Sequence, residues 1–198
     1  MTRPDREEAE RAVDTLLRWI GEDPARDGLR RTPARVVEAW LEHASGYRTT
    51  PAEALGDLFD EIETVDEIVL LRDIGFESHC EHHLAPIVGR AHVAYLPGKK
   101  VVGIGRLARL VDCLAKRLQV QERLTAEIAE AIQEILAPRG VAVMIQATHH
   151  CMTTRGVHKP GAVMVTSRLL GAFRTDRELR RDFYAMIGQP GVDAIARA

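Results

Sequence analysis

The chain has 198 residues, of which 45% are hydrophobic and 28% charged, an ordinary composition for a globular protein with a buried core. Its net charge of -2 excludes a global basic field that would attract nucleic acid, so an anionic ligand would need a local group of Lys and Arg. No apolar run approaches the roughly 20 residues that cross a bilayer, and the charged N-terminus lacks an apolar signal segment. We therefore expect a cytoplasmic protein that binds neither nucleic acid nor membrane.

The first third of the chain has helical patterning. Apolar residues recur at helical spacing up to Gly21, which is expected to end the first helix. Thr32-Pro33 predicts the start of a second helix, with Thr32 as the N-cap. A shorter helix is expected after Thr50-Pro51, with an apolar side formed by Leu55, Leu58 and Phe59.

Strand patterns begin near residue 65. Residues 68–71 form a short apolar run, and residues 87–96 are rich in β-branched and aromatic side chains. The turn signal Pro97-Gly98 predicts a hairpin between residues 87–96 and a strand at 101–104. Two further strands are expected, at residues 141–147 and 162–169.

Helical spacing returns at residues 107–118 and 124–136, and Asp176 is expected to cap a last helix. Helices and strands are thus segregated along the chain, which predicts an α+β fold with a mainly antiparallel sheet. We expect one domain over residues 1–198, with a helical N-terminal part at 1–64 and the sheet within 65–198.

The chain has three cysteines, and such an odd, small number argues against a disulfide framework. Cys113 lies within a helical apolar pattern and is interpreted as a core residue. The other two cysteines stand beside histidines, in Cys80-Glu81-His82-His83 and in His149-His150-Cys151. A catalytic zinc site uses three Cys or His ligands, whereas a structural site fills all four positions. The spacing alone leaves open whether a metal binds here and whether it is catalytic.

Three blocks of sequence resemble the signature of type I GTP cyclohydrolases, the GTP cyclohydrolase I family. They are CEHHLAP at residues 80–86, QVQERLT at 119–125, and CMTTRGV at 151–157, which runs on into KPGA at 159–162. The similarity covers roughly residues 29–173. It implies conversion of GTP to 7,8-dihydroneopterin triphosphate and formate, the entry step to folate or tetrahydrobiopterin. It also implies a tunnelling-fold (T-fold) unit, an antiparallel sheet backed by two helices, in a homodecamer of two pentamers with active sites between subunits.

The resemblance also implies roles for individual residues. Cys80, His83 and Cys151 correspond to the ligands of Zn²⁺, whose bound water attacks C8 of guanine. His149 corresponds to the acid that protonates N7, and His82 to the group that moves protons at the ribose oxygens.

The substrate contacts follow from the same resemblance. Glu122 corresponds to the carboxylate that accepts hydrogen bonds from the N1–H and amino group of guanine, and Gln121 adds a contact in that pocket. Arg106, Arg109 and Arg155 are expected to bind the triphosphate.

The sequence departs from the family where Gly105-Arg106 replaces the usual Ser-Lys, which keeps the positive charge but removes a hydroxyl donor. His158 stands where bacterial members usually have Gln. Two alternative functions stay open. One is a purine nucleotide hydrolase that opens the ring and releases a different product. The other is a non-catalytic, zinc-stabilised scaffold that binds nucleotides. Iron could also replace zinc at such ligands.

Overall fold

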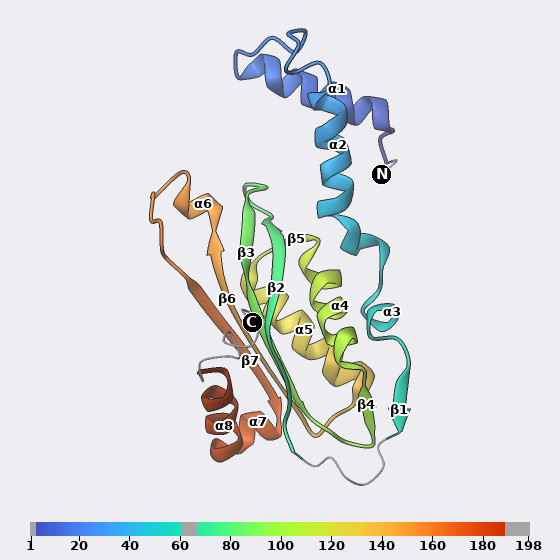
Figure 1. Cartoon of the computed structure of the whole chain (residues 1–198), viewed down its shortest axis with the longest axis vertical. Coiled ribbons are helices and arrows are strands. Elements are labelled where there is room, and N and C mark those ends of the chain that lie inside the picture. Colours follow the sequence, from blue (N-terminus) through green and yellow to red (C-terminus); the bar gives the residue numbers. More distant parts are fainter. Residues whose placement is uncertain (1–2, 61–66, 189–198) are drawn as a thin grey trace, which may run out of the picture. The chain divides into compact units, whose positions relative to one another are not determined.

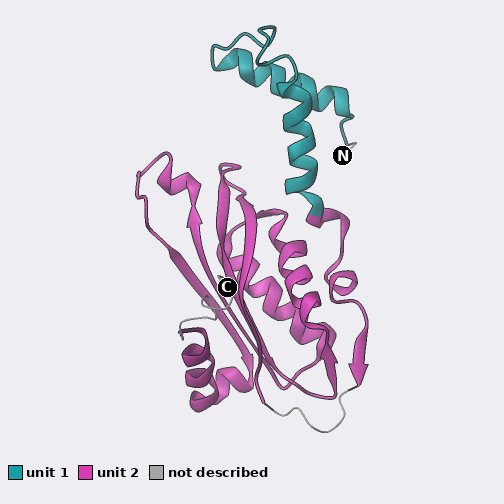
Figure 2. Ribbon diagram, viewed as in Figure 1, with its two compact units in different colours: residues 1–45 teal, residues 46–198 magenta. Residues whose placement is uncertain are grey.

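The computed structural model describes residues 3–60 and 67–188. The chain forms two compact units, residues 1–45 and 46–198 (Figure 2). The boundary expected between residues 64 and 65 falls within residues 61–66, which lie outside the described residues.

Unit 1 contains α1 (Arg6–Trp19), the first helix predicted from the sequence. The carboxylate of Asp5 accepts a hydrogen bond from the N–H of Glu8 at 2.8 Å and so caps its N-terminus. The chain leaves the helix through Gly21, whose φ of 92° is a conformation that side chains disfavour. Gly21 therefore ends this helix as expected.

The second helix of unit 1 is α2 (Thr32–His43). The prediction that Thr32 is its N-cap is wrong by one residue, because Thr32 is already helical and Arg31 occupies the cap without a side-chain hydrogen bond. Pro33 lies in the first turn as predicted. N–H groups at this position have no partner within the helix, so a proline costs no hydrogen bond here.

From residue 45 onward the chain combines helices and strands. In order they are η1 (Ser45–Arg48), α3 (Pro51–Leu55), β1 (Leu58–Asp60), β2 (Val69–Cys80), β3 (Pro86–Leu96), β4 (Lys100–Val102), α4 (Ile104–Ala115), β5 (Leu118–Gln119), α5 (Gln121–Leu136), β6 (Gly140–His149), α6 (His150–Thr153), β7 (Met164–Gly171), α7 (Ala172–Thr175) and α8 (Arg177–Gly188). Asp176 caps α8 as predicted, because its carboxylate accepts from the N–H groups of Glu178 and Leu179 at 2.8 and 3.2 Å.

Five strands form one sheet in the order β5-β2-β3-β6-β7 (Figure 1). The neighbouring strands are antiparallel except for β5, which pairs in parallel with the end of β2. β1 and β4 form a separate antiparallel pair. The prediction of an α+β fold with a mainly antiparallel sheet is confirmed.

The predicted hairpin between residues 87–96 and 101–104 is wrong. β3 is paired along its length with β2 on one side and β6 on the other, so it has no free edge for a third strand. The short strand β4 pairs with β1 instead, with Leu58 opposite Val102, and Ile104 already belongs to α4. The third predicted helix is also too long, because Gly56 with a φ of 62° follows its last residue.

The two faces of the sheet pack against different helices (Figure 1). Val93 of β3 belongs to the larger core, which the sheet forms with α4 and α5. Its neighbours on the other face, Ala94 and Leu96, pack in a smaller core with Phe173 of α7 and Phe183 of α8. Within residues 3–60 and 67–188, no helix is both long and apolar enough to cross a bilayer.

Candidate functional site

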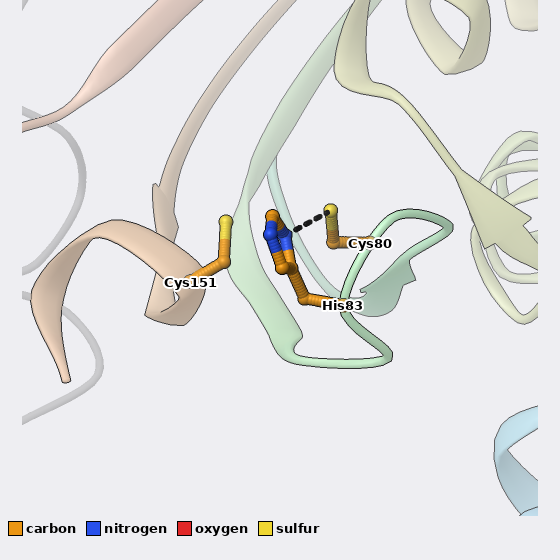
Figure 3. A group of neighbouring side chains, drawn as sticks. All are labelled: Cys80, His83 and Cys151. Carbon is orange, nitrogen blue, oxygen red and sulfur yellow. Dashed lines mark hydrogen bonds between the residues drawn. The ribbon is translucent and has the colours of Figure 1, made fainter. Parts of the chain in front are cut away.

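A tight turn at the end of β2 brings Cys80 and His83 together. The N–H of Cys80 donates to the carbonyl oxygen of Ala85, and the N–H of Leu84 donates to the carbonyl oxygen of Cys80, each at 2.8 Å. Leu84 has a φ of 54°, a left-handed conformation that is costly for a residue with a side chain. The turn leaves Sγ of Cys80 3.9 Å from Nδ1 of His83 (Figure 3).

The pairing of β3 with β6 carries Cys151 to this turn. His149, the last residue of β6, is the register partner of Ile87 near the start of β3, and the chain then enters α6. As a result, the donor atoms of Cys80, His83 and Cys151 all lie within 4.8 Å of one another. Figure 3 shows the His83 ring between the two sulfur atoms. Two clusters that are far apart in the sequence thus form one group, which we call the metal group.

The donor set of the metal group suits a thiophilic cation. Tetrahedral zinc with bonds of about 2.0–2.3 Å holds its donors about 3.5–3.8 Å apart. Donors within 4.8 Å of one another therefore need only small side-chain shifts to bind one ion. Burial raises the pKa of the Cys151 thiol, the nearby Cys80 thiol raises it further, and the charge of Arg155 acts in the opposite direction. A cation between the thiols would reverse this effect and favour thiolates.

His82 lies next to the metal group but is not part of it. Its Nδ1 is 3.9 Å from Sγ of Cys80, and its Nε2 is 3.8 Å from Oε1 of Glu81. The side chain of His82 is 64% exposed. Its imidazole is therefore accessible from outside the protein.

His149 approaches the site from β6 and is held by the first residue of α5. Its Nε2 lies 2.8 Å from Oε1 of Gln121. Burial lowers the pKa of His149, and the negative charge of Glu122 opposes that shift. Glu122 itself is exposed in the first turn of α5. The three residues expected to contact guanine or its N7 are thus neighbours.

Gln121 is buried, with 1% of the residue exposed, and its amide makes hydrogen bonds within the protein. The contact between Gln121 and guanine that the resemblance implies stays a prediction.

The three candidate phosphate ligands fall into two groups. Arg155 follows α6, is exposed, and is close enough to Cys151 to influence its thiol electrostatically. Arg106 and Arg109 lie in the first half of α4, which begins beside β4 and ends beside β5 (Figure 1). The guanidinium of Arg106 lies against Gly56, where an added Cβ would meet its Cζ at 2.7 Å. Arg106 therefore lies near the end of α4 that is beside β4, away from the end beside β5 (Figure 1).

Sequence reasoning missed a network that supports the turn. Arg123 forms an ion pair with Glu81 and donates from Nε to Oε1 of Gln119 at 3.0 Å. Gln119 is 1% exposed, and its Nε2 donates to Oε2 of Glu127 at 2.8 Å. These residues lie within or beside the blocks of similarity, but their partners depend on how α5 lies against β5 and the turn that follows β2.

The chain is similar to known proteins of one enzyme family. The family model described as GTP cyclohydrolase I matches residues 9–188. GTP cyclohydrolase 1 of Maricaulis maris (strain MCS10) is 54% identical over 186 residues, which cover 94% of this chain and 91% of that protein. GTP cyclohydrolase 1 of Sinorhizobium fredii (strain NBRC 101917 / NGR234) is 51% identical over 185 residues, which cover 93% and 90%.

Among solved structures, archaeosine synthase QueF-Like in the apo form matches 53% of this chain and 94% of its own, with a TM-score of 0.45 and 20% identity. The family model spans most of the residues, and each of the two relatives is about half identical over nine-tenths of the chain. The chain belongs to the GTP cyclohydrolase I family.

Proposed function

We propose that this chain hydrolyses GTP to 7,8-dihydroneopterin triphosphate and formate, using a zinc ion held by Cys80, His83 and Cys151. The observation that carries the proposal is the convergence of these three donors within 4.8 Å, in a chain that belongs to the GTP cyclohydrolase I family. Three protein ligands rather than four are typical of a catalytic zinc site. When bound, zinc supplies Lewis-acid chemistry and an activated water as the nucleophile for C8 of guanine.

The protein's own histidines supply the proton transfers. Addition at C8 requires a proton at N7, and His149 is the candidate donor because it lies two residues from Cys151 and beside Glu122. After ring opening and loss of formate, the ribose must open and rearrange. His82 is exposed next to Cys80 and is the candidate for moving protons at the ribose oxygens.

Glu122 is the candidate for guanine selection. A carboxylate accepts two hydrogen bonds from the N1–H and exocyclic amino group of guanine, and adenine does not present that pair of donors. The exposed position of Glu122 beside His149 supports a single pocket for the base. Gln121 precedes it on α5, so any contact that it makes with guanine would fall in the same pocket.

The triphosphate requires more cations than one chain brings to the site. Arg155 is beside the metal group. Arg106 lies near the other end of α4 from Ala115, and a rise of 1.5 Å per residue puts about 14 Å of helix between these two residues. We therefore propose that Arg106 and Arg109 act on the triphosphate bound at a neighbouring chain. This supports a homo-oligomer with shared sites, in the family form a decamer of two pentamers built from T-fold units. The family match spans both compact units, which supports one catalytic domain.

Product mass tests this proposal against its alternatives. Zinc-loaded protein is incubated with GTP, and in parallel with ATP, and the products are identified by mass spectrometry. We expect dihydroneopterin triphosphate and formate from GTP and no product from ATP. Accumulation of a ring-opened formamide would indicate a hydrolase that stops early. Unchanged GTP with bound zinc would favour the nucleotide-binding scaffold.

A further inference from the structure

The orientation of the Gln121 side-chain amide is determined by its acceptors. Its Nε2 lies 3.2 Å from the carbonyl oxygen of Ile145, 3.0 Å from that of Met164, and 3.1 Å from Oγ1 of Thr166. Carbonyl oxygens only accept hydrogen bonds, so the atom that faces them must be the NH₂ group. A flipped amide would place Oε1 against two other oxygen atoms in a buried site, which is strongly unfavourable.

Two threonine hydroxyls reinforce this orientation. Oγ1 of Thr125 donates to the carbonyl oxygen of Gln121 at 2.7 Å, so its single proton is already committed. Oγ1 of Thr166 lies 2.6 Å from Oγ1 of Thr125 and must therefore be the donor in that pair. Thr166 then has lone pairs free to accept from Nε2 of Gln121. Three hydrogen bonds therefore form a cycle: Thr125 donates to the carbonyl oxygen of Gln121, Thr166 donates to Thr125, and the side-chain amide of Gln121 donates to Thr166. Only this set of proton positions satisfies all three.

The same orientation directs Oε1 of Gln121 at His149. Because an amide oxygen only accepts, Nε2 of His149, at 2.8 Å, must carry the hydrogen. Nδ1 is then the ring nitrogen left for the reaction. We propose that Gln121 is a positioning residue: it fixes a hydrogen on Nε2 of His149 and so leaves Nδ1 as the ring nitrogen that takes up a proton and passes it to the substrate. This inference rests on the proposed function, in which His149 acts on N7 of guanine.

A different role for Gln121, as a side chain that contacts guanine, predicts different kinetics. Removal of a contact made equally in the ground and transition states raises KM and leaves kcat unchanged. Removal of a residue that orients a catalytic group lowers kcat. Because Gln121 is 1% exposed in this chain, we expect the second result.

The test compares Gln121→Met with Gln133→Met. Gln133 lies on the same helix and donates to the carbonyl oxygen of Pro138 at 3.2 Å, so the same substitution there removes a hydrogen bond without touching His149. We expect kcat of Gln121→Met to fall about 10- to 100-fold, as for other orienting partners, with zinc content and KM for GTP nearly unchanged. Gln133→Met should keep the wild-type kcat. A raised KM with an unchanged kcat in Gln121→Met would overturn the proposal.

Nitrogen-15 NMR of histidine-labelled protein supplies a readout that does not need turnover. The His149 signals, assigned by their loss in His149→Ala, should show a protonated Nε2 and an unprotonated Nδ1 in the wild type, and a mixture of tautomers in Gln121→Met. A protonated Nδ1 in neutral wild-type His149 would overturn the inference even if the enzyme is active. If GTP is not turned over, the proposed function fails, and the NMR result still decides the role of Gln121.

A milder variant covers the case in which Gln121→Met does not fold. Thr166→Val removes the hydroxyl that accepts from Nε2 of Gln121 and leaves Gln121 and His149 in place. We expect a smaller loss of kcat and partial mixing of the His149 tautomers. Wild-type kcat and a single tautomer in a folded Thr166→Val protein, in which the amide has lost one of its three acceptors, would contradict the proposed cycle.

Discussion

Arg123 and Glu81 form an ion pair that joins the first turn of α5 to the turn carrying Cys80 and His83. The hydrogen bond from Arg123 lowers the pKa of Glu81, so this carboxylate stays ionised at neutral pH. Both side chains are partly exposed, and ion pairs of this kind contribute little to the free energy of folding. The main effect of the pair is therefore expected on the metal group.

Arg123→Gln should weaken zinc binding by about 10-fold, because the turn loses the partner that orients it. The free energy of unfolding of the metal-free protein should stay close to the wild-type value. Zinc affinity is measured by competition with a chelating dye, and stability by urea unfolding. Arg168→Gln is the control, since Arg168 forms a similarly exposed pair with Glu130 at 2.8 Å. Equal zinc affinity in the two variants would show that the Glu81 pair does not support the metal group.

Glu122→Gln should lower kcat/KM for GTP by about 10- to 100-fold, because an amide cannot accept both guanine hydrogen bonds and loses the charge. Zinc content should stay at the wild-type level, since Glu122 is not a ligand. The measurement is steady-state turnover with GTP and inosine triphosphate, which lacks the exocyclic amino group. A loss for GTP without any change in the preference between the two nucleotides would argue against base recognition by Glu122.

Gly89→Ala should destabilise the fold, and Gly75→Ala should not. A Cβ at Gly89 would lie 2.3 Å from the carbonyl oxygen of Gln146 and 2.5 Å from Cβ of Ala147, where β3 meets β6. Such overpacking costs about 1–3 kcal/mol. A Cβ at Gly75 would meet nothing within 4 Å. Urea unfolding of both variants measures the difference, and similar stabilities would mean that the β3–β6 pairing adjusts freely.

His92 should make stability depend on pH. Burial lowers the pKa of His92, which is 4% exposed, and its Nδ1 accepts from the N–H of Asp73 at 3.2 Å. The unfolded chain therefore binds a proton at a higher pH than the folded protein does. Neutral His92 therefore contributes fully to the free energy of unfolding above the pKa that it has in the unfolded chain, about 6.5. This contribution is lost as the pH falls from there through the lower pKa of His92 in the folded protein.

His92→Asn tests this dependence, because Asn cannot be protonated but its side-chain oxygen can accept from Asp73. We expect the free energy of unfolding to fall less steeply between pH 6.5 and pH 5 than in the wild type. The other histidines contribute equally to the pH dependence of both proteins, so the difference between the two profiles reports on His92. Parallel pH profiles would exclude His92 as a source of acid sensitivity.

The elements that could be predicted are those with long, regular patterns. Residues 87–96 and 124–136 carry enough alternating or helical spacing to be found as β3 and α5. The errors fall where a short segment takes its structure from a distant partner. Phe59 was predicted to be helical but is a strand residue because β4 pairs with it. Leu118 fits the apolar side of the helix that precedes it, but it lies in β5, where it pairs with His79 of β2.

The candidate site also has a part that could be predicted from the sequence and a part that could not. Cys80, His83 and Cys151 were found because resemblance to a family links two clusters that are distant in the chain, and the structure brings them within 4.8 Å. The partners of Gln121 could not be predicted. They require α5 to lie over the pairing of β6 with β7, where Ile145 and Thr166 are register partners. The sequence alone therefore identified candidate ligands but not the hydrogen bonds that orient them.

The central claim is that the metal group catalyses GTP hydrolysis, and turnover by zinc-quantified Cys151→Ser protein tests it most directly. Formate release and the fluorescence of the oxidised pterin are followed in the wild type, in Cys151→Ser, and in Cys113→Ser as control. Cys113 is buried in the core, and its Sγ donates to the carbonyl oxygen of Thr49 at 3.2 Å, which a serine can still do. We predict that Cys151→Ser loses both zinc and activity, whereas Cys113→Ser keeps zinc and turnover. Full zinc and full turnover in Cys151→Ser would contradict the account.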